Sequence, residues 1–161
     1  MDILLQTEEH SHYGISKKLF VMIYNYINTK YQLYGEKSYP DTIIRVGEKN
    51  AQLEIWDIGQ GLCIVTAWNP ASKERSLKVN TEENLRLQSE ITHFKHYRAV
   101  GSADDSSWSE DGFAILNISL EESIQLGHQF KQNAIVWIGP TKIPRLVMCN
   151  PTISASSLVQ S

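Results

Sequence analysis

The alternation of apolar and polar segments predicts a repeating order of strands and helices within residues 62–138. The first helix of this region is expected to begin at Asn80 or Thr81, because Asn80 and Glu83 have the spacing of a helix-capping box. The second helix is expected after Ser119, which forms a capping-box pattern with Glu122. Apolar runs predict the four strands, at residues 62–68, 97–100, 113–118 and 134–138.

The order of these elements, strand, helix, strand, strand, helix, strand, predicts the fold class. It is the order of a ferredoxin-like split β-α-β core, so we expect an α+β protein whose antiparallel four-stranded sheet carries both helices on one face. We expect one domain over residues 1–149, with this core at residues 62–138. A flexible, serine-rich tail is expected at residues 150–161.

Residues 1–61 are expected to add an N-terminal extension made of a helix and a β-hairpin. The helix is predicted over residues 17–28, with Ser16 as its N-cap. Apolar segments at residues 42–46 and 53–56 predict the two arms of the hairpin. The extension would lengthen the sheet or cover its second face, and it contains six of the seven tyrosines of the chain.

Composition and charge narrow the class of protein. The chain has 161 residues, 42% of them hydrophobic, and its 15 basic and 18 acidic residues give a net charge of −3. These values suit a soluble globular domain and argue against binding to nucleic acid or an anionic membrane, which needs a surplus of positive charge. The sequence has no membrane-spanning run of ~20 apolar residues and no signal-peptide pattern. With two cysteines, Cys63 and Cys149, in apolar surroundings, we expect reduced core thiols and a cytoplasmic location.

Four separated motifs resemble a bacterial domain family of unknown function. They are the segment Thr66-Ala67-Trp68-Asn69-Pro70, Asn84 on the following helix, Trp108-x-Glu110 before Phe113, and Gln132-Asn133-Ala134 at the start of a strand. The resemblance covers about residues 62–138. It implies a small cytosolic protein from a bacterium or a phage, and it assigns no activity and no catalytic residue.

Polar side chains near the ends of the predicted strands form the candidate site. Glu110 is the candidate catalytic acid or base, because the aromatic ring of Trp108 close by can raise the pKa of its carboxyl. The amide side chains can orient a polar ligand, but amides at such positions also satisfy the backbone of turns and helix ends, and this alternative stays open. The candidate binding residues are Trp68, Asn69, Asn84, Trp108, Gln132 and Asn133.

The sequence predicts no metal site and no cofactor. His93 and His96 could share a metal ion with Glu90, but two imidazoles are too few ligands, and a histidine near a helix C-terminus is explained by the helix dipole. The acidic loop that holds Asp104 and Asp105 could suit a cation or a basic partner, but a solvated surface loop is the favoured interpretation. The chain has no phosphate-binding glycine loop and no hydrolase nucleophile motif.

Three functions stay open at this point. The favoured one is a binding or regulatory module for a small polar ligand or a protein partner. The second is an enzyme on a nucleotide-like or other polar small substrate with Glu110 as acid/base, and it predicts that Trp68, Asn69, Glu110 and Gln132 line one pocket. The third is an RNA-binding domain, which needs exposed aromatic side chains on an open sheet face. The oligomeric state is not predicted.

Overall fold

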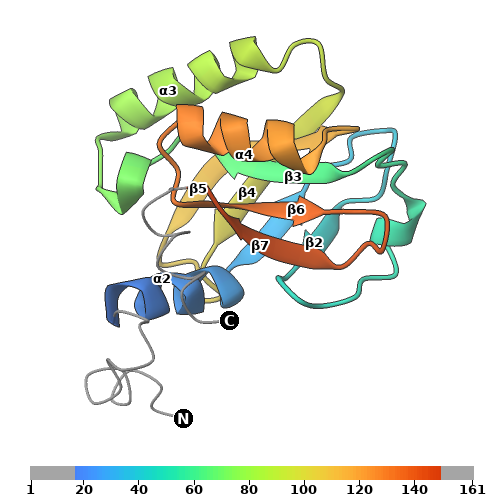
Figure 1. Cartoon of the computed structure of the whole chain (residues 1–161), viewed down its shortest axis with the longest axis horizontal. Helices are drawn as coiled ribbons and strands as arrows, with labels where there is room; N and C mark the ends of the chain where they lie inside the picture. The colour runs from blue at the N-terminus through green and yellow to red at the C-terminus, as the bar shows by residue number, and fades with distance from the viewer. Residues whose placement is uncertain (1–16, 150–161) are drawn as a thin grey trace.

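The computed structural model describes residues 17–149, and this part of the chain forms three α-helices and one seven-stranded sheet (Figure 1). The helices are α2 (Lys17–Ile27), α3 (Leu77–Glu90) and α4 (Leu120–Gln129). The strands are β1 (Lys30–Leu33), β2 (Thr42–Ile44), β3 (Leu62–Thr66), β4 (His96–Ser102), β5 (Ser109–Leu116), β6 (Ala134–Ile138) and β7 (Pro144–Met148). The predicted mixture of helices and strands is confirmed, and the sheet has seven strands, three more than the predicted core.

The strand order of the sheet is β2-β1-β4-β5-β3-β6-β7, and all neighbouring strands are antiparallel. The four strands predicted for the core occupy the middle, and β1 and β2 extend the sheet on one side while β7 extends it on the other. In β1, Tyr31 lies opposite Ile44 of β2 and Gly101 of β4, so β1 joins the N-terminal segment to the core.

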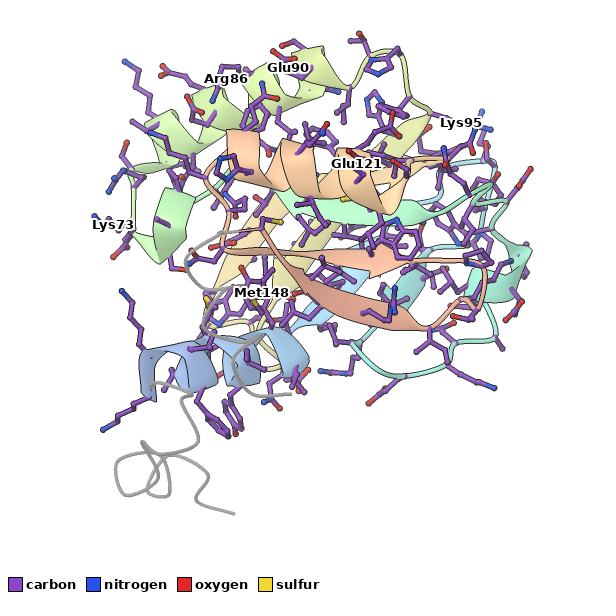
Figure 2. All side chains as sticks on the ribbon, in the orientation of Figure 1. Lys73, Arg86, Glu90, Lys95, Glu121 and Met148 are labelled. Carbon is purple, nitrogen blue, oxygen red and sulfur yellow. The ribbon has the colours of Figure 1, made fainter. Side chains whose placement is uncertain are left out.

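The two faces of the sheet bury separate apolar clusters. Helices α3 and α4 cover one face, where Leu87 and Phe130 pack with Cys63 and Ile115. Glu90 and Glu121 on these helices are exposed, whereas Arg86 lies over the ring of Phe130, 4.3 Å from its centroid (Figure 2). The other face is concave and packs against α2 and the segment that leads into β3 (Figure 1). We call it the concave face.

The sheet curls into a half-barrel whose two edges approach each other. The backbone N–H of Gly47, just after β2, donates to the carbonyl of Pro144 at the start of β7 over 2.8 Å. Lys142 Nζ, from the turn before β7, donates to the carbonyls of Glu54 (2.9 Å) and Trp56 (3.1 Å). These bonds fasten the segment of residues 45–58 across the concave face, where Trp56 is fully buried.

The prediction that residues 53–56 form the second arm of a β-hairpin is wrong. Residues Leu53–Ile55 form a single 3-10 turn, because the side-chain oxygen of Asn50 accepts the backbone N–H groups of Gln52 (2.8 Å) and Leu53 (3.3 Å) and bends the chain. The partner of β2 is β1 instead, a short strand in which Tyr31 and Leu33 are buried and their neighbours are not.

The start of the first core helix also differs from the prediction. Helix α3 begins at Leu77, and Ser76 is its N-cap, whose Oγ accepts the N–H of Val79 over 3.2 Å. Asn80 is therefore inside the helix, and its side chain is buried. The capping box of Ser119 and Glu122 is confirmed at the start of α4. Ser16, the predicted cap of α2, and the predicted tail at residues 150–161 lie outside the described residues.

None of the helices within residues 17–149 has the length and hydropathy that crossing a membrane requires. Cys63 and Cys149 are buried and free, and burial raises the pKa of each thiol to about 12.

Candidate functional site

A cavity of about 70 Å³ opens on the concave face, and its lining comes from α2 and from the sheet. Most of its lining is apolar and comes from the middle strands. Three aromatic side chains reach it from separate segments, Tyr26 from α2, Tyr31 from β1 and Trp108 from the turn before β5. Glu110 is the only carboxyl among the described residues that line it.

Glu110 reaches the cavity because of its position in β5. Side chains alternate along a strand, and Ala114 and Leu116 of β5 belong to the concave cluster, so Glu110 lies on the same face. Its Oε1 accepts a hydrogen bond of 2.9 Å from Asn69 Nδ2. Within residues 17–149 no Lys, Arg or His forms an ion pair with it. Burial raises the pKa of the Glu110 carboxyl, and the hydrogen bond from Asn69 opposes part of that rise.

A second asparagine, Asn80, fixes the position of Asn69. Asn80 Oδ1 accepts the backbone N–H of Asn69 (2.9 Å), and Asn80 Nδ2 donates to Asn69 Oδ1 (3.0 Å) and to the carbonyl of Arg75 (3.3 Å). Asn69 Oδ1 also accepts the backbone N–H of Arg75 over 3.0 Å. With its oxygen occupied in this way, Asn69 must present its amide protons to Glu110. Sequence reasoning assigned Asn80 to a helix cap and so missed this role.

The turn that carries Asn69 is strained. Asn69, Ala71 and Ser72 all have positive φ, at 46°, 56° and 59°. Such a backbone costs about 1–3 kcal/mol for each residue that disfavours it and persists only where the surroundings hold it in place. Here the N–H of Ala71 donates to the carbonyl of Lys131 (2.7 Å), and Asn133 Nδ2 donates to Ser72 Oγ (2.8 Å). Asn133 therefore supports the turn and is not among the groups that line the cavity.

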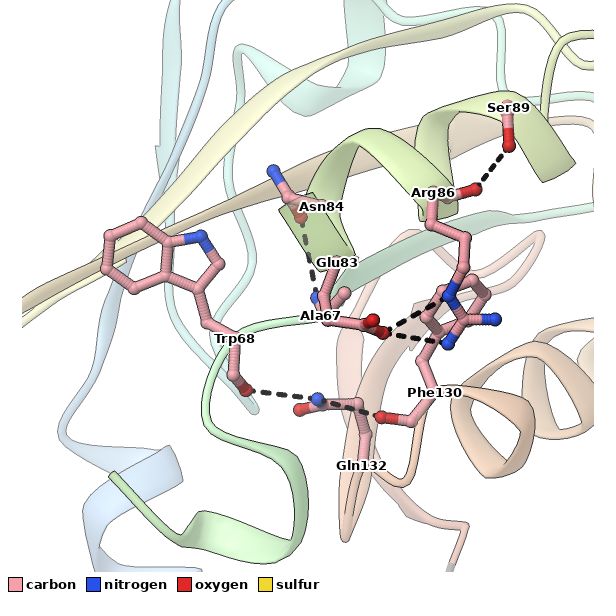
Figure 3. Close-up of polar contacts among 8 residues, drawn as sticks. All are labelled: Ala67, Trp68, Glu83, Asn84, Arg86, Ser89, Phe130 and Gln132. Carbon is pink, nitrogen blue, oxygen red and sulfur yellow. Dashed lines mark hydrogen bonds and ion pairs between the residues drawn. The ribbon is translucent and has the colours of Figure 1, made fainter. Parts of the chain in front are cut away.

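Gln132 and Asn84 bond to the backbone on either side of the same turn (Figure 3). Gln132 Nε2 donates to the carbonyls of Trp68 (3.1 Å) and Phe130 (3.3 Å), and Asn84 Oδ1 accepts the N–H of Ala67 over 3.4 Å. In Figure 3 the indole of Trp68 extends away from Gln132. Its Nε1 is buried and has no hydrogen-bond partner within residues 17–149.

The predicted site residues thus fall into two groups. Glu110 and Trp108 line the cavity, and Asn69 touches Glu110 directly. The remaining four, Trp68, Asn84, Gln132 and Asn133, belong to the turn and its supports. The residues that sequence reasoning missed are Asn80, Tyr26 and Tyr31. The tyrosine-rich composition of residues 1–61 was the available signal for the last two.

The two histidines of the α3–β4 connection make other contacts. The His93 ring packs against Phe94 at 4.2 Å between centroids, and His96 Nδ1 lies 2.9 Å from the carbonyl of Phe94. Within residues 17–149 no three His, Cys, Asp or Glu side chains are grouped closely enough to hold a metal ion.

Replacing Glu110 by glutamine is expected to weaken the dependence of stability on pH. Because folding raises the pKa of Glu110 above its ordinary value of 4.5, its contribution to stability is complete below that value and is lost as pH rises through the folded-state pKa. The free energy of unfolding, measured by urea denaturation, should therefore increase in the Glu110→Gln variant relative to the wild type as pH rises from below 4.5 to neutral. A difference that stays constant with pH would contradict this.

Comparisons with known proteins bear on the same segment. No curated protein and no solved structure matches the chain. The segment that does match a family model contains Asn69, Asn80 and Glu110 and leaves out Tyr26 and Tyr31. Residues 65–135 match the family described as "Protein of unknown function (DUF3293)", so the resemblance of this part of the chain to a domain family of unknown function is confirmed.

Proposed function

We propose that the chain is a binding module that holds a small polar group of its ligand against Glu110 in the concave-face cavity. The observation that carries this proposal is a carboxyl that is largely buried, has Asn69 as its hydrogen-bond partner and lies in a mostly apolar cavity. Burying such a group costs free energy unless a partner satisfies it. A network of asparagines and a strained turn, which hold Asn69 in place, support a role beyond folding.

The size of the cavity limits what can enter it. Sites for drug-sized ligands usually measure about 300–1,000 Å³, and this cavity measures about 70 Å³. A volume of this size favours a head group of a few atoms over a nucleobase. The rest of a longer ligand would extend out of the cavity past Trp108, whose side chain is 41% exposed.

The enzyme alternative is favoured by one observation, the raised pKa of Glu110. A carboxyl that binds its proton more tightly than usual can act as a general acid or base closer to neutral pH. The described lining has no serine, cysteine, lysine or histidine that could act as a nucleophile or a second acid or base beside it. A substrate would have to supply the other reacting groups, so binding remains the preferred function.

Nucleic-acid binding has less support from the sheet. An RNA-binding sheet stacks bases on exposed aromatic side chains. Here α3 and α4 cover one face, and α2 with residues 45–58 covers much of the other. Trp108 and Tyr24 are the most exposed aromatic residues described, and Tyr24 lies on α2 rather than on the sheet.

We also propose a ferredoxin-like core for the sheet and a cytoplasmic location for the protein. The middle strands have the order β4-β5-β3-β6 with antiparallel neighbours, which supports a ferredoxin-like split β-α-β core. The two free, buried thiols support the reducing cytoplasm as the location of the protein.

A thermal-shift screen of small cationic, neutral and anionic compounds tests the proposed function. A compound that binds the folded state at 100 times its Kd stabilises it by about 2.7 kcal/mol and raises Tm. The shift should be lost in Glu110→Gln, each variant being compared with its own Tm without ligand. It should persist in the matched control Asp111→Asn, because Asp111 pairs with Arg98 (2.9 Å) outside the cavity. The proposal would be contradicted if no compound raised Tm, or if the compounds that did so raised it equally in the Glu110→Gln variant.

A further inference from the structure

We propose that the head group held in the cavity is a primary ammonium, so that the ligand is an alkylamine. This inference rests on the proposed function and names the chemical class of the ligand. Three properties of the described residues carry it, namely the charge balance of the cavity, the aromatic side chains around it and the hydrogen-bonding capacity of its polar groups.

The charge balance of the cavity favours a cation. Glu110 supplies a carboxylate, and the described lining contains no basic side chain. The nearby arginines are engaged elsewhere, since Arg98 pairs with Asp111 and Arg45 pairs with Asp104. A cation that entered would supply the missing partner of the carboxylate, whereas an anion would meet repulsion from it.

The aromatic lining suits the same class of ligand. Tyr26, Tyr31 and Trp108 approach the cavity from three segments of the chain. An ammonium close to the face of an aromatic ring gains about 0.5–2 kcal/mol, and most where water is excluded. The small volume admits an ammonium and its first carbons, while the stem of an alkylamine can contact the apolar side chains around the opening.

Glu110 and two threonine hydroxyls of the lining offer acceptors to a ligand, beside the O–H groups of Tyr26 and Tyr31. Thr29 Oγ1 donates its proton to the carbonyl of Asn25 (2.7 Å), and Thr66 Oγ1 donates to the carbonyl of Asp111 (2.6 Å). Thr66 Oγ1 also accepts the backbone N–H of Trp68 over 3.0 Å, so it keeps one lone pair for a ligand. The hydroxyl of Thr29 likewise offers a ligand lone pairs and no proton. Glu110 accepts from Asn69 through Oε1, and no described residue donates to Oε2. A primary ammonium has three donors and no acceptor, which matches this set.

The same arrangement predicts proton linkage. An ammonium pairs with the ionised form of Glu110, so binding should lower the pKa of Glu110 and weaken as pH falls through it. The other titratable groups that face Glu110 are Tyr26 on α2 and Tyr31 on β1. Burial raises the pKa of both phenols, so they stay neutral across the range of the experiment.

The test is an NMR titration of the full chain, labelled with ¹³C at the glutamate side-chain carboxyls and ¹⁵N at the indoles. The probes are ethylammonium chloride, ethanol and sodium acetate, at constant ionic strength and pH 7. We expect ethylammonium to shift the Glu110 carboxyl and the Trp108 indole signals in a saturable manner, with affinity at least tenfold above that of ethanol. A repeat at several pH values should show a lower pKa for Glu110 when ethylammonium is bound.

Variants separate this inference from the proposed function. Ethylammonium affinity should fall at least tenfold in Glu110→Gln and stay unchanged in Asp111→Asn. If ethanol or acetate bound at Glu110 as tightly as ethylammonium, the inference of an alkylamine ligand would be wrong, but the proposed binding function would still hold. If ethylammonium did not bind, the inference of an alkylamine ligand would also be wrong. The proposed function has a separate test. It would be wrong if every compound found in the thermal-shift screen still raised Tm in the Glu110→Gln variant.

Discussion

Replacing Trp56 by alanine is expected to lower the free energy of unfolding by about 3–5 kcal/mol, the range for truncating a large buried aromatic residue. Trp56 is fully buried in the cluster of the concave face. Its ring stacks on Tyr39 at 4.5 Å and meets Tyr97 edge-on at 5.4 Å. Its Nε1 donates to Thr42 Oγ1 over 3.0 Å, so the change also leaves a buried hydroxyl with one partner fewer.

Urea denaturation of the wild type and two variants measures this effect. Ile55→Ala is the matched control, because Ile55 precedes Trp56 in the same segment and is 62% exposed. The control should change the free energy of unfolding by no more than about 0.5 kcal/mol. A loss below about 1.5 kcal/mol for Trp56→Ala would show that residues 45–58 contribute little to the closure of the half-barrel.

Replacing Asn80 by leucine is expected to cost about 2–4 kcal/mol of stability and to alter the candidate site as well. The side chain is only 3% exposed and bonds to three backbone or amide groups. Its loss would leave the N–H of Asn69 unpaired, and each buried polar group without a partner costs about 1–3 kcal/mol. Asn69 would then hold its amide less firmly against Glu110, so the pKa of Glu110 should rise further.

Two measurements on the same variant check both parts of this prediction. Urea denaturation gives the loss of stability, and ¹³C NMR of the glutamate carboxyls gives the pKa of Glu110. Asn84→Leu is the control, because Asn84 lies one turn further along α3, is half-buried and makes a single 3.4 Å bond. An Asn80→Leu variant with an unchanged pKa of Glu110 would show that Asn80 does not position Asn69.

The parts of the fold that the sequence predicted are those with local causes. The capping box at Ser119 depends on residues three apart, and it begins α4 as expected. The apolar runs of β3 and β6 predicted strands because both faces of each are buried.

The parts that could not be predicted depend on contacts between distant segments. The strand β1 is short, and its partner on the core side, β4, lies about 70 residues further along the chain. Asn80 matched a helix-cap pattern, and only the folded structure shows Asn69 against it. The same holds for the candidate site. Glu110 was identified from its neighbour Trp108, but the tyrosines beside it arrive through the pairing of β1 with the core.

The contact between Gly47 and Pro144 has a consequence for how molecules of this protein meet one another. Open edges of β-sheets expose unpaired N–H and C=O groups, which invite pairing with a second chain and aggregation. Here the two edge strands are short, with three residues in β2 and five in β7, and the sheet bends them towards each other. The curvature that shapes the concave face therefore also limits the rows of backbone groups on which intermolecular sheets could grow.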